Sequence, residues 1–332
     1  MKQRRKLESA STAASGKHRW YKGDLHCHTH HSDGKQDVAD LAAAAHAGGL
    51  DFLAITDHNT TSHWHEIAAQ TAPPVILIHG QEITTYKGHA NVWGAQGWLD
   101  FRLDTADAMV MVAQAAHQQG AVFSINHPKE GGPPWQYGDD IPADCVEVWQ
   151  APWFVSNYQS LVWWDGLLRK GRRLVAVGGS DLHELPRPDR LAPYPLGTPT
   201  TWVYAAAPTP AAILDGIRAG HVFVSAAPAG PQLYLTSGNT MQGDVLSVPH
   251  DGAFVVRCRV RGAKGKILRL VSSRGLEATV NITSERFDHE HRLPTAGLLY
   301  VRAEVIRPPE GDLAREPAAL IVDALSNPIY VT

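Results

Sequence analysis

The sequence predicts an α/β fold in which a strand–helix barrel is followed by a small all-β domain. Residues 19–228 alternate short apolar runs with helical patterns, as in a parallel sheet covered by helices. The pattern changes at Ala226–Pro231, a linker rich in Pro, Gly and Ala. Beyond it, residues 229–332 alternate apolar and polar positions without a long helical pattern. The chain has 332 residues, enough for one large domain and a smaller partner.

Repeated strand–helix succession in the first domain indicates a barrel of the (βα) type. In such barrels the active site forms at the carboxyl ends of the strands. The expected strands are Tyr21–Cys27, Phe52–Thr56, Val75–Ile78, Ala90–Trp93, Val122–Ile125, Cys145–Trp149, Leu174–Val177 and Thr201–Ala205. The expected helices are Asp37–Ala47, Thr105–Gln119, Leu161–Lys170 and Pro210–Ala219.

The second domain is expected to be a small antiparallel sandwich. Its predicted strands are Gln232–Thr236, Phe254–Val260, Ile267–Val271, Ala278–Ile282, Leu299–Val305, Ala319–Asp323 and Ile329–Val331. Arg302 and Glu304 alternate on one of these strands, and we expect a cross-strand ion pair there.

Composition and charge exclude several classes of protein. The net charge is −3 and the basic residues do not cluster, so no stable nucleic-acid complex is expected. Residues 1–18 are basic and then rich in Ser and Ala, which predicts a disordered arm and no signal peptide. No apolar run is long enough to cross a membrane. Cys27, Cys145 and Cys258 are far apart and odd in number, so we expect reduced thiols in a cytoplasmic protein. The oligomeric state is not predicted.

Histidine is the unusual component. The chain has 18, and 13 of them lie between His18 and His127, which indicates metal binding or acid–base chemistry. His26 and His28 are two apart at a strand end, so both rings face the same side. Cys27, between them, could be a metal ligand, but strand alternation points it the other way, so a buried thiol is the favoured interpretation.

Possible ligands recur where the other apolar runs end. Asp57 and His58 follow one run, Glu82 the next, His127 another, and Asp181 with His183 a further one. His89 stands just before a short strand, and Asp33 lies in a Ser-Asp-Gly turn. Each alone has an ordinary explanation as a cap, turn or core residue, but together they would meet at one face of a barrel.

These motifs resemble those of the PHP (polymerase and histidinol phosphatase) superfamily. The ordered motifs are His-Cys-His-Thr with Ser-Asp-Gly, Ile-Thr-Asp-His-Asn, Gly-Gln-Glu-Ile, Asn-His-Pro and Gly-Ser-Asp-Leu-His, within about residues 20–225. Gly197–Thr201, Ile217–Ser225 and the C-terminal Ser-Asn-Pro-Ile-Tyr resemble the CehA/McbA-type branch, which carries a β-domain after the barrel.

The resemblance implies a distorted (βα)7 barrel with two to three divalent ions of Zn, Mn or Fe. One ion would be held by His26, His28, Glu82 and Asp181. Glu82 would bridge to a second, completed by His89 and His127. Asp33, His58 and His183 would hold the third. A metal-bound water would then be the nucleophile.

Several other side chains near the motifs have two possible roles. Asp57 is expected either to orient a ligand or to cap a helix. Lys87, Lys129, Arg187 and Arg190 could contact a phosphate, although a solvated surface charge is the alternative for each. His30, His31, His63, His65 and His79 are expected around the site, with His79 buried beside it. Trp135, Trp149 and Trp153 would form either an aromatic wall or core.

Three functions are consistent with these residues. The first is a phosphoesterase acting on a small phosphorylated molecule, either a monoester or a diester. The second is a carbamate, ester or amide hydrolase of the CehA/McbA type. The third is a non-catalytic metal-binding protein. Two or more converging Lys or Arg side chains would favour the first, and an aromatic, uncharged pocket the second.

Overall fold

The computed structural model describes residues 18–131, 133–187, 194–248, 252–308 and 320–332. The disordered arm expected at residues 1–18 lies outside this part except for His18. Within the described residues, no helix is both long and apolar enough to cross a lipid bilayer.

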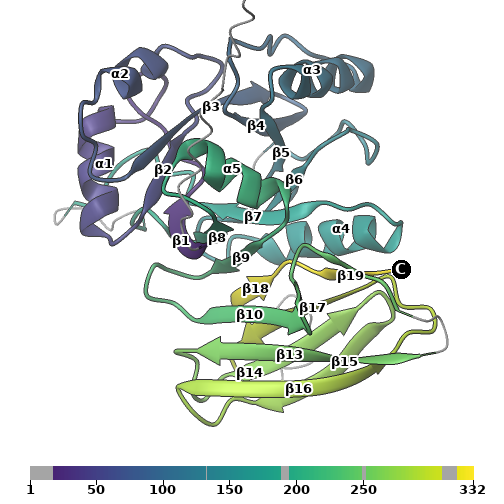
Figure 1. The fold of residues 1–332 in the computed structure, drawn as a ribbon. Helices are drawn as coiled ribbons and strands as arrows, with labels where there is room; N and C mark the ends of the chain where they lie inside the picture. The colour runs from purple at the N-terminus through teal and green to yellow at the C-terminus, as the bar shows by residue number, and fades with distance from the viewer. Residues whose placement is uncertain (1–17, 132, 188–193, 249–251, 309–319) are drawn as a thin grey trace, which may run out of the picture.

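The N-terminal part of the described chain alternates strands and helices (Figure 1). Its strands are β1 (Arg19–Asp24), β2 (Phe52–Ile55), β3 (Ile76–Thr85), β4 (Gly88–Trp93), β5 (Val122–Asn126), β6 (Cys145–Gln150), β7 (Val175–Gly179), β8 (Thr200–Ala205) and β9 (Val222–Ser225). Its helices are α1 (Val38–Ala47), α2 (His63–Ala69), α3 (Ala106–Gln118), α4 (Asn157–Arg169) and α5 (Pro210–Arg218). The predicted strands and helices all overlap one of these elements, and α2 and β9 are additions to the prediction.

Three of the helices begin where a side chain satisfies a free amide of the first turn. Asp37 accepts from Asp40 N at 2.7 Å, and Thr105 and Thr209 accept from the amides of Ala108 and Ala212 at 3.2 Å. These caps fix where α1, α3 and α5 start, and so fix the loops that follow β1, β4 and β8.

The strands of this part form a sheet in the order β8-β1-β2-β3-β4-β5-β6-β7. β1–β2–β3 and β5–β6–β7 are parallel, as predicted. The prediction is wrong for β4, which runs antiparallel to β3 and β5, and for β8, which runs antiparallel to β1. Only Tyr86 and Lys87 separate β3 from β4, and so short a connection can join antiparallel strands but not parallel ones.

The sheet curls until the segments beyond β1 and β7 pair. Cys27 and Leu182 form a parallel bridge, and Asp181 N donates to the carbonyl of His26 at 2.8 Å. The Thr201 hydroxyl of β8 links to the backbone of Gly178 in β7, with distances of 2.7 and 2.9 Å. Since no continuous ladder joins β7 to β8 or β1 in the described part of the chain, the (βα)7 barrel stays a prediction.

The C-terminal part is a two-layered β-structure. Its strands are β10 (Gln232–Ser237), β11 (Thr240–Met241), β12 (Val245–Leu246), β13 (Ala253–Arg261), β14 (Ile267–Ser272), β15 (Gly275–Asn281), β16 (Arg286–Pro294), β17 (Tyr300–Ile306), β18 (Val322–Ser326) and β19 (Ile329–Val331). One layer has the order β11-β10-β13-β16. Its apolar face, with Leu233 and Val256, packs on Leu268 and Val305 of the other layer.

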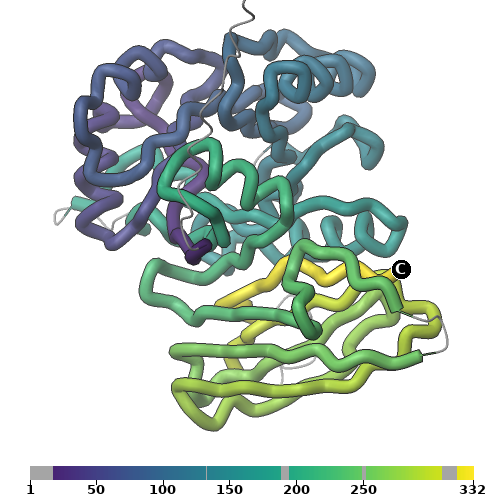
Figure 2. The backbone as a smooth tube through the Cα atoms, in the orientation of Figure 1, coloured from purple at the N-terminus to yellow at the C-terminus, as the bar shows by residue number. Residues whose placement is uncertain are grey.

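The second of these layers is continuous with the N-terminal sheet. β18 pairs antiparallel with β9, and β17 and β19 continue the same sheet. In Figures 1 and 2 the yellow C-terminal strands lie between the α/β part and the four-stranded layer. One core cluster joins Trp149 and Trp164 of the first part to Tyr300 and Leu325 of the second. The predicted domain boundary between residues 228 and 229 therefore stays a prediction. The two parts on either side of it share one sheet and one core cluster.

Arg302 and Glu304 differ from the expected cross-strand pair. Both lie on β17 and contact each other along that strand, and both are buried. Across the strands, Glu304 faces Arg269 of β14 at 3.6 Å, while Arg302 reaches Asp165 of α4 at 2.9 Å. The buried charges therefore tie a helix of the first part to the sheet of the second.

Candidate metal centre

The nine side chains singled out in the sequence converge at one edge of the curled sheet. His26, His28 and His58 follow β1 and β2, and Glu82 lies in the second half of β3. His89 is at the start of β4, and the hairpin returns it to the same edge as Glu82, its ring nitrogen 3.1 Å from the Glu82 carboxylate. His127 follows β5, while Asp181 and His183 follow β7.

Ligand atoms from these residues lie within 4.8 Å of one another in three overlapping groups. The groups are His26, His28, Glu82 and Asp181; Glu82, His89 and His127; and His28, Asp33, His58 and His183. They correspond to the three sets implied by the family resemblance, with His28 added to the third. Glu82 is shared by two groups and His28 by two, so the three form one continuous centre.

The first group is the most deeply buried. His26, His28 and Glu82 are fully buried, and the Asp181 side chain is mostly so. His26 Nε2 lies 3.4 Å from a Glu82 oxygen and 3.3 Å from an Asp181 oxygen, and His28 Nε2 lies 2.9 Å from the same Asp181 oxygen. Two carboxylates therefore face two imidazoles in a largely buried group, in which only Asp181 is partly exposed.

The third group is the most open. His58 Nε2 and His183 Nε2 are 3.4 Å apart, and both approach one oxygen of Asp33, at 3.5 and 3.2 Å. The Asp33 side chain is 59% exposed. The rings of His58 and His183 each stack on His28, with centroids 4.2 Å apart. This end of the centre can therefore admit a molecule from solvent.

Glu147 of β6 is a buried acid that the sequence reasoning missed. Its carboxylate lies 2.9 Å from His26 Nδ1, on the other side of the ring from Glu82 and Asp181, and it groups with His26 and His127. A lone carboxylate inside the apolar run Cys145–Trp149 was the available signal, because a charge is seldom buried without a partner. Glu147 fixes the ring of His26 as the partners of ligating histidines do.

Asp57 orients a loop and caps no helix. Its carboxylate accepts from Thr29 N at 2.7 Å, from the Thr29 hydroxyl at 2.6 Å and from the Ser32 hydroxyl at 2.6 Å. His63 of α2 approaches it at 3.0 Å. Burial raises the pKa of Asp57, but the His63 contact and the two hydroxyls outweigh burial and lower it to about 2. The loop that carries Asp33 is therefore held by an ionised carboxylate.

Two candidate ligands have unusual backbone conformations. His127 has φ of 29° and Asp181 has φ of 53°, in the left-handed region that residues with side chains rarely adopt. Strain of this kind persists only where the surroundings enforce it, and it gathers at functional sites. Nearby, Gly179 lets β7 approach β1, because a Cβ there would lie 2.4 Å from the Cβ of His26.

The electrostatics of the centre favour ionised acids. Burial raises the pKa of Glu82, but the charge of His26 and contacts with His127, His26 and His58 lower it well below its ordinary range. Burial also raises the pKa of Asp181, but the charge of His26 and the contact with His28 outweigh burial and lower it. In the opposite sense, burial lowers the pKa of His26, but Asp181, Glu147 and Glu82 raise it well above its ordinary value.

This donor set fits divalent cations. His26 Nε2, His28 Nδ1 and His127 Nε2 are buried and have no hydrogen-bond partner among the described residues. Such atoms are costly unless something binds them. Imidazole nitrogens and carboxylate oxygens together are the ligands that Zn²⁺, Mn²⁺ and Fe²⁺ take in proteins.

Lys129 lies two residues after His127. It is buried, and its Nζ donates to the Gln150 carbonyl at 3.2 Å and to Asn157 Oδ1 at 2.8 Å. Burial lowers its pKa to about 8, against the charges of Glu147 and Asp181. Gln150 in turn donates to Asp181 at 2.9 Å. The surface-charge alternative is therefore wrong for Lys129.

Two of the other proposed phosphate contacts are engaged by protein groups, and their role toward a phosphate stays a prediction. Lys87 is exposed and donates to the Asp104 carbonyl, and Arg187 pairs with Glu184 at 2.9 Å. Arg190 lies outside the described residues. Of the four basic residues proposed, the three that the structure describes each contact another protein group.

The remaining predictions near the site are mostly settled by burial. Cys27 is buried, and its thiol donates to the Ala54 carbonyl, as its predicted side of the strand requires. Trp149 and Trp153 belong to the core and form no aromatic wall, and Trp135 packs on Tyr137. His79 packs against Trp64 and is only half-buried, so the expectation that it is buried is wrong, and it belongs to none of the ligand groups.

The other histidines expected around the site differ in exposure. His63 is buried against Asp57. His31 lies 2.9 Å from Glu66, and with His30 and that carboxylate it forms a separate, more exposed group. His65 is exposed on α2.

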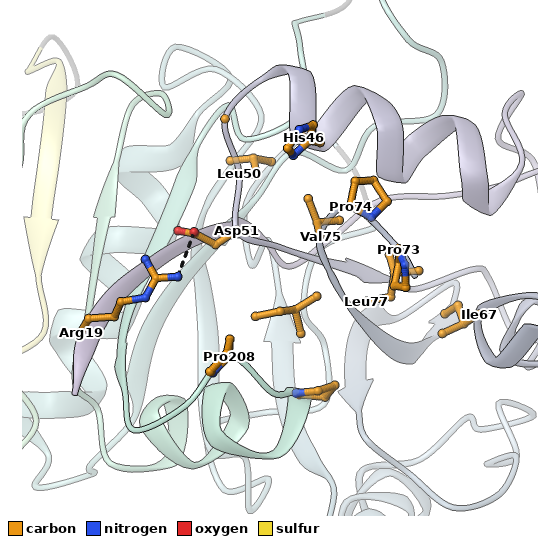
Figure 3. A pocket seen from close by; sticks show the side chains of 13 residues that line it. Arg19, His46, Leu50, Asp51, Ile67, Pro73, Pro74, Val75, Leu77 and Pro208 are labelled. Carbon is orange, nitrogen blue, oxygen red and sulfur yellow. Dashed lines mark hydrogen bonds and ion pairs between the residues drawn. The ribbon is translucent and has the colours of Figure 1, made fainter. Parts of the chain in front are cut away.

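A cavity of about 730 Å³ lies at the opposite edge of the sheet, near the amino ends of β1, β2 and β3 (Figure 3). Arg19 and Asp51 pair across it at 3.5 Å, and Leu50, Val75 and Pro208 line it. It contains none of the nine candidate ligands, so it is not part of the centre.

The PHP domain family model matches residues 24–126 of this chain. The match contains His26, His28, Asp33, His58, Glu82 and His89, and it ends before His127, Asp181 and His183. No curated protein sequence matches the chain significantly.

Several solved structures are similar to this chain. A two-domain protein from Bacteroides vulgatus, assigned a PHP-like metal-dependent phosphoesterase, is 16% identical over 92% of this chain and 95% of that one, with a TM-score of 0.47. A protein from Bifidobacterium adolescentis, assigned as a metal-dependent phosphoesterase, is 18% identical over 52% and 90%, with a TM-score of 0.39. An amidohydrolase from Chromobacterium violaceum with bound sulfate and no metal is 15% identical over 52% and 89%, with a TM-score of 0.36.

Proposed function

We propose that this protein is a multinuclear metal-dependent hydrolase, with phosphoesters of small molecules as its substrates. The observation that supports this most strongly is the continuous centre, in which Glu82 and His28 are each shared by two of three ligand groups. The match of the PHP domain model to residues 24–126 supports the same class. We propose Zn, Mn or Fe as the ions, numbering two or three.

When bound, divalent cations supply a water nucleophile near neutral pH and neutralise charge on a phosphoryl or carbonyl oxygen. The chain's own residues prepare that chemistry. Glu82 and Asp181 remain ionised because His26 and His28 face them. Glu147 fixes the His26 ring, and burial shields His26, His28 and Glu82 from bulk water. The open third group, with Asp33 at its rim, is where a substrate would enter.

Hydrolysis of a carbamate, ester or amide, as in the CehA/McbA type, is the second candidate. The specific observation in its favour is that the three proposed phosphate-binding cations within the described residues each contact another protein group. Lys87 and Arg187 are engaged elsewhere, and Lys129 is held by Gln150 and Asn157. A trinuclear centre could still bind a phosphate dianion through its metal ions alone, which is why we place phosphoesters first.

A hydrolysis screen separates the two candidates. Protein purified without chelator and supplied with Mn²⁺ or Zn²⁺ should be compared on p-nitrophenyl phosphate, bis-p-nitrophenyl phosphate, nucleoside monophosphates and a 1-naphthyl carbamate. We expect turnover of a phosphoester. Turnover of the carbamate alone would support the second candidate, and binding of metal without any turnover would indicate a non-catalytic protein.

Alanine at His26, Glu82 or Asp181 should abolish that turnover and leave the far-ultraviolet circular dichroism unchanged. His221→Ala is the matched control, because His221, between α5 and β9, also pairs with an acid, Asp244 at 2.8 Å, and belongs to none of the ligand groups. Full turnover in the Glu82→Ala protein would rule out the proposed centre as the catalyst.

A further inference from the structure

A second cavity, of about 530 Å³, lies between α4 and the C-terminal sheet. Its walls come from α4 on one side and from β14, β15, β17 and β18 on the other. Much of the lining is apolar, including Leu161, Val162, Leu276 and Val322. None of the nine candidate ligands lines it, so it is separate from the metal centre.

The cavity has an apolar rim that water reaches. Val162 is 61% exposed and Leu276 is 56% exposed, on opposite walls. Leu161 is buried behind them. Between the walls, Gly166 of α4 leaves open space, since a Cβ there would meet nothing within 4 Å. The volume is in the range of sites that hold small organic ligands.

Charged groups from both walls line part of the cavity. Arg302 is buried and saturated, because it contacts Asp165 at 2.9 Å and also contacts Glu304. Asp165 additionally accepts from Tyr300 at 2.8 Å and from Arg169 at 2.8 Å. These contacts compensate the two carboxylates.

Arg269 differs from its neighbours. Its guanidinium approaches Glu304 only at 3.6 Å, and its buried Nε has no hydrogen-bond partner among the described residues. The lining contains three guanidinium groups and two carboxylates, so one positive charge is in excess. An unpaired buried donor and an excess positive charge both favour an anion at this place.

We propose that this cavity binds a small amphipathic carboxylate. The carboxylate would pair with Arg269, and the apolar body would cover Leu161, Val162 and Leu276. A planar carboxylate matches the two-pronged guanidinium, and one negative charge balances the one in excess. A neutral apolar ligand would leave the Arg269 Nε without an acceptor, and a polyphosphate would not fill the apolar walls.

The binding test uses the full-length, metal-loaded protein with octanoate as the probe and octan-1-ol as its uncharged counterpart. Binding is measured by calorimetry and by the shift in melting temperature. We expect saturable binding of octanoate, with octan-1-ol at least about tenfold weaker because it lacks the charge-assisted contact. Absence of octanoate binding, or equal binding of the two, would overturn the proposal.

Two variants locate the site. Gly166→Leu should fill the cavity and abolish octanoate binding, while leucine is a better helix former than glycine, so the fold is kept. Arg269→Met should weaken octanoate at least about tenfold and leave octan-1-ol unchanged. Arg259→Met, at an exposed arginine of β13, is the matched control. Unchanged octanoate affinity in the folded Gly166→Leu protein would place the binding elsewhere and refute the assignment.

Discussion

The imidazole of His26 is held from two sides. Glu147 contacts Nδ1 at 2.9 Å, while Nε2 faces Glu82 and Asp181. A ring whose second nitrogen pairs with a carboxylate has a fixed tautomer and orientation, and such partners typically contribute a factor of about 10–100 to metal affinity. Glu147 therefore acts on the proposed centre through His26.

We expect Glu147→Gln to lower the affinity for Zn²⁺ or Mn²⁺ by about 10–100-fold without unfolding the protein. Calorimetric titration of metal-free protein measures this directly. Asp244→Asn, which alters the carboxylate beside His221, is the control and should bind the ions as wild type does. Equal affinities in the two variants would contradict a positioning role for Glu147.

At the residue scale, candidate ligands could be predicted from the sequence where they lie at or just after the end of a strand. His58, His127 and Asp181 each follow an apolar run directly, and the structure brings them together, although their role as ligands stays a prediction. Glu147 was hidden because it stands within a strand, where an inward-facing position is normally apolar. Its partner His26 is far away in sequence, so no local pattern pairs them.

At the scale of elements, the β3–β4 hairpin determines which side of the sheet His89 reaches. Periodicity predicts that a strand exists, but its direction depends on the turn before it. Gly88 follows that turn with φ of 137°, and a Cβ there would lie 2.7 Å from Trp135. The edge strand β16 was also missed, because exposed charged residues along it conceal the apolar alternation.

Helix α4 is joined to β17 by a charge contact whose strength depends on pH. Burial raises the pKa of Asp165, but Arg302, Arg169 and Tyr300 outweigh burial and lower it below its ordinary value of 3.8. A carboxyl group with a lowered pKa in the folded state stabilises the fold above its ordinary pKa. That stability is lost as the pH falls through the lower, folded-state value.

Asp165→Asn should therefore lower the free energy of unfolding by roughly 3–5 kcal/mol at neutral pH. The difference in unfolding free energy between wild type and variant should shrink from about pH 5 downwards, because the wild-type carboxyl takes up a proton. Urea unfolding at several pH values measures this gap. Asp288→Asn, at an exposed pair with Arg261, should show little gap at any pH. A gap that stayed constant into acid would show that Asp165 contributes by packing alone.

At the scale of the molecule, the two parts share a sheet and a core. β9 pairs with β18, and Trp164 and Val224 pack in one cluster with Tyr300 and Leu325. The change of pattern near residue 226 was visible in the sequence, but pairing between distant strands was not. The sequence of a short strand such as β9 does not indicate which strand it pairs with. Its partner, β18, follows about a hundred residues later in the chain.

A chain shortened to residues 1–228 should fail to fold as a stable unit. It would lose the partner of β9 and expose the face of Trp149 and Trp164 that the C-terminal strands cover. The full chain should instead unfold in one transition, seen equally by tryptophan fluorescence and far-ultraviolet circular dichroism. Native-like melting of the shortened chain would show that the first part is an independent domain.

Helix α4 contacts both the surroundings of the metal centre and the second cavity. Its first residue, Asn157, holds Lys129 and Gln150, and Gln150 reaches Asp181, while Leu161 and Gly166 line the second cavity. If an occupant of that cavity shifts α4 and thereby changes the affinity of the centre for cations, thermodynamic reciprocity requires that cations change the occupant's affinity by the same factor. Titrating octanoate with and without Mn²⁺, and Mn²⁺ with and without octanoate, would measure one coupling energy by two routes.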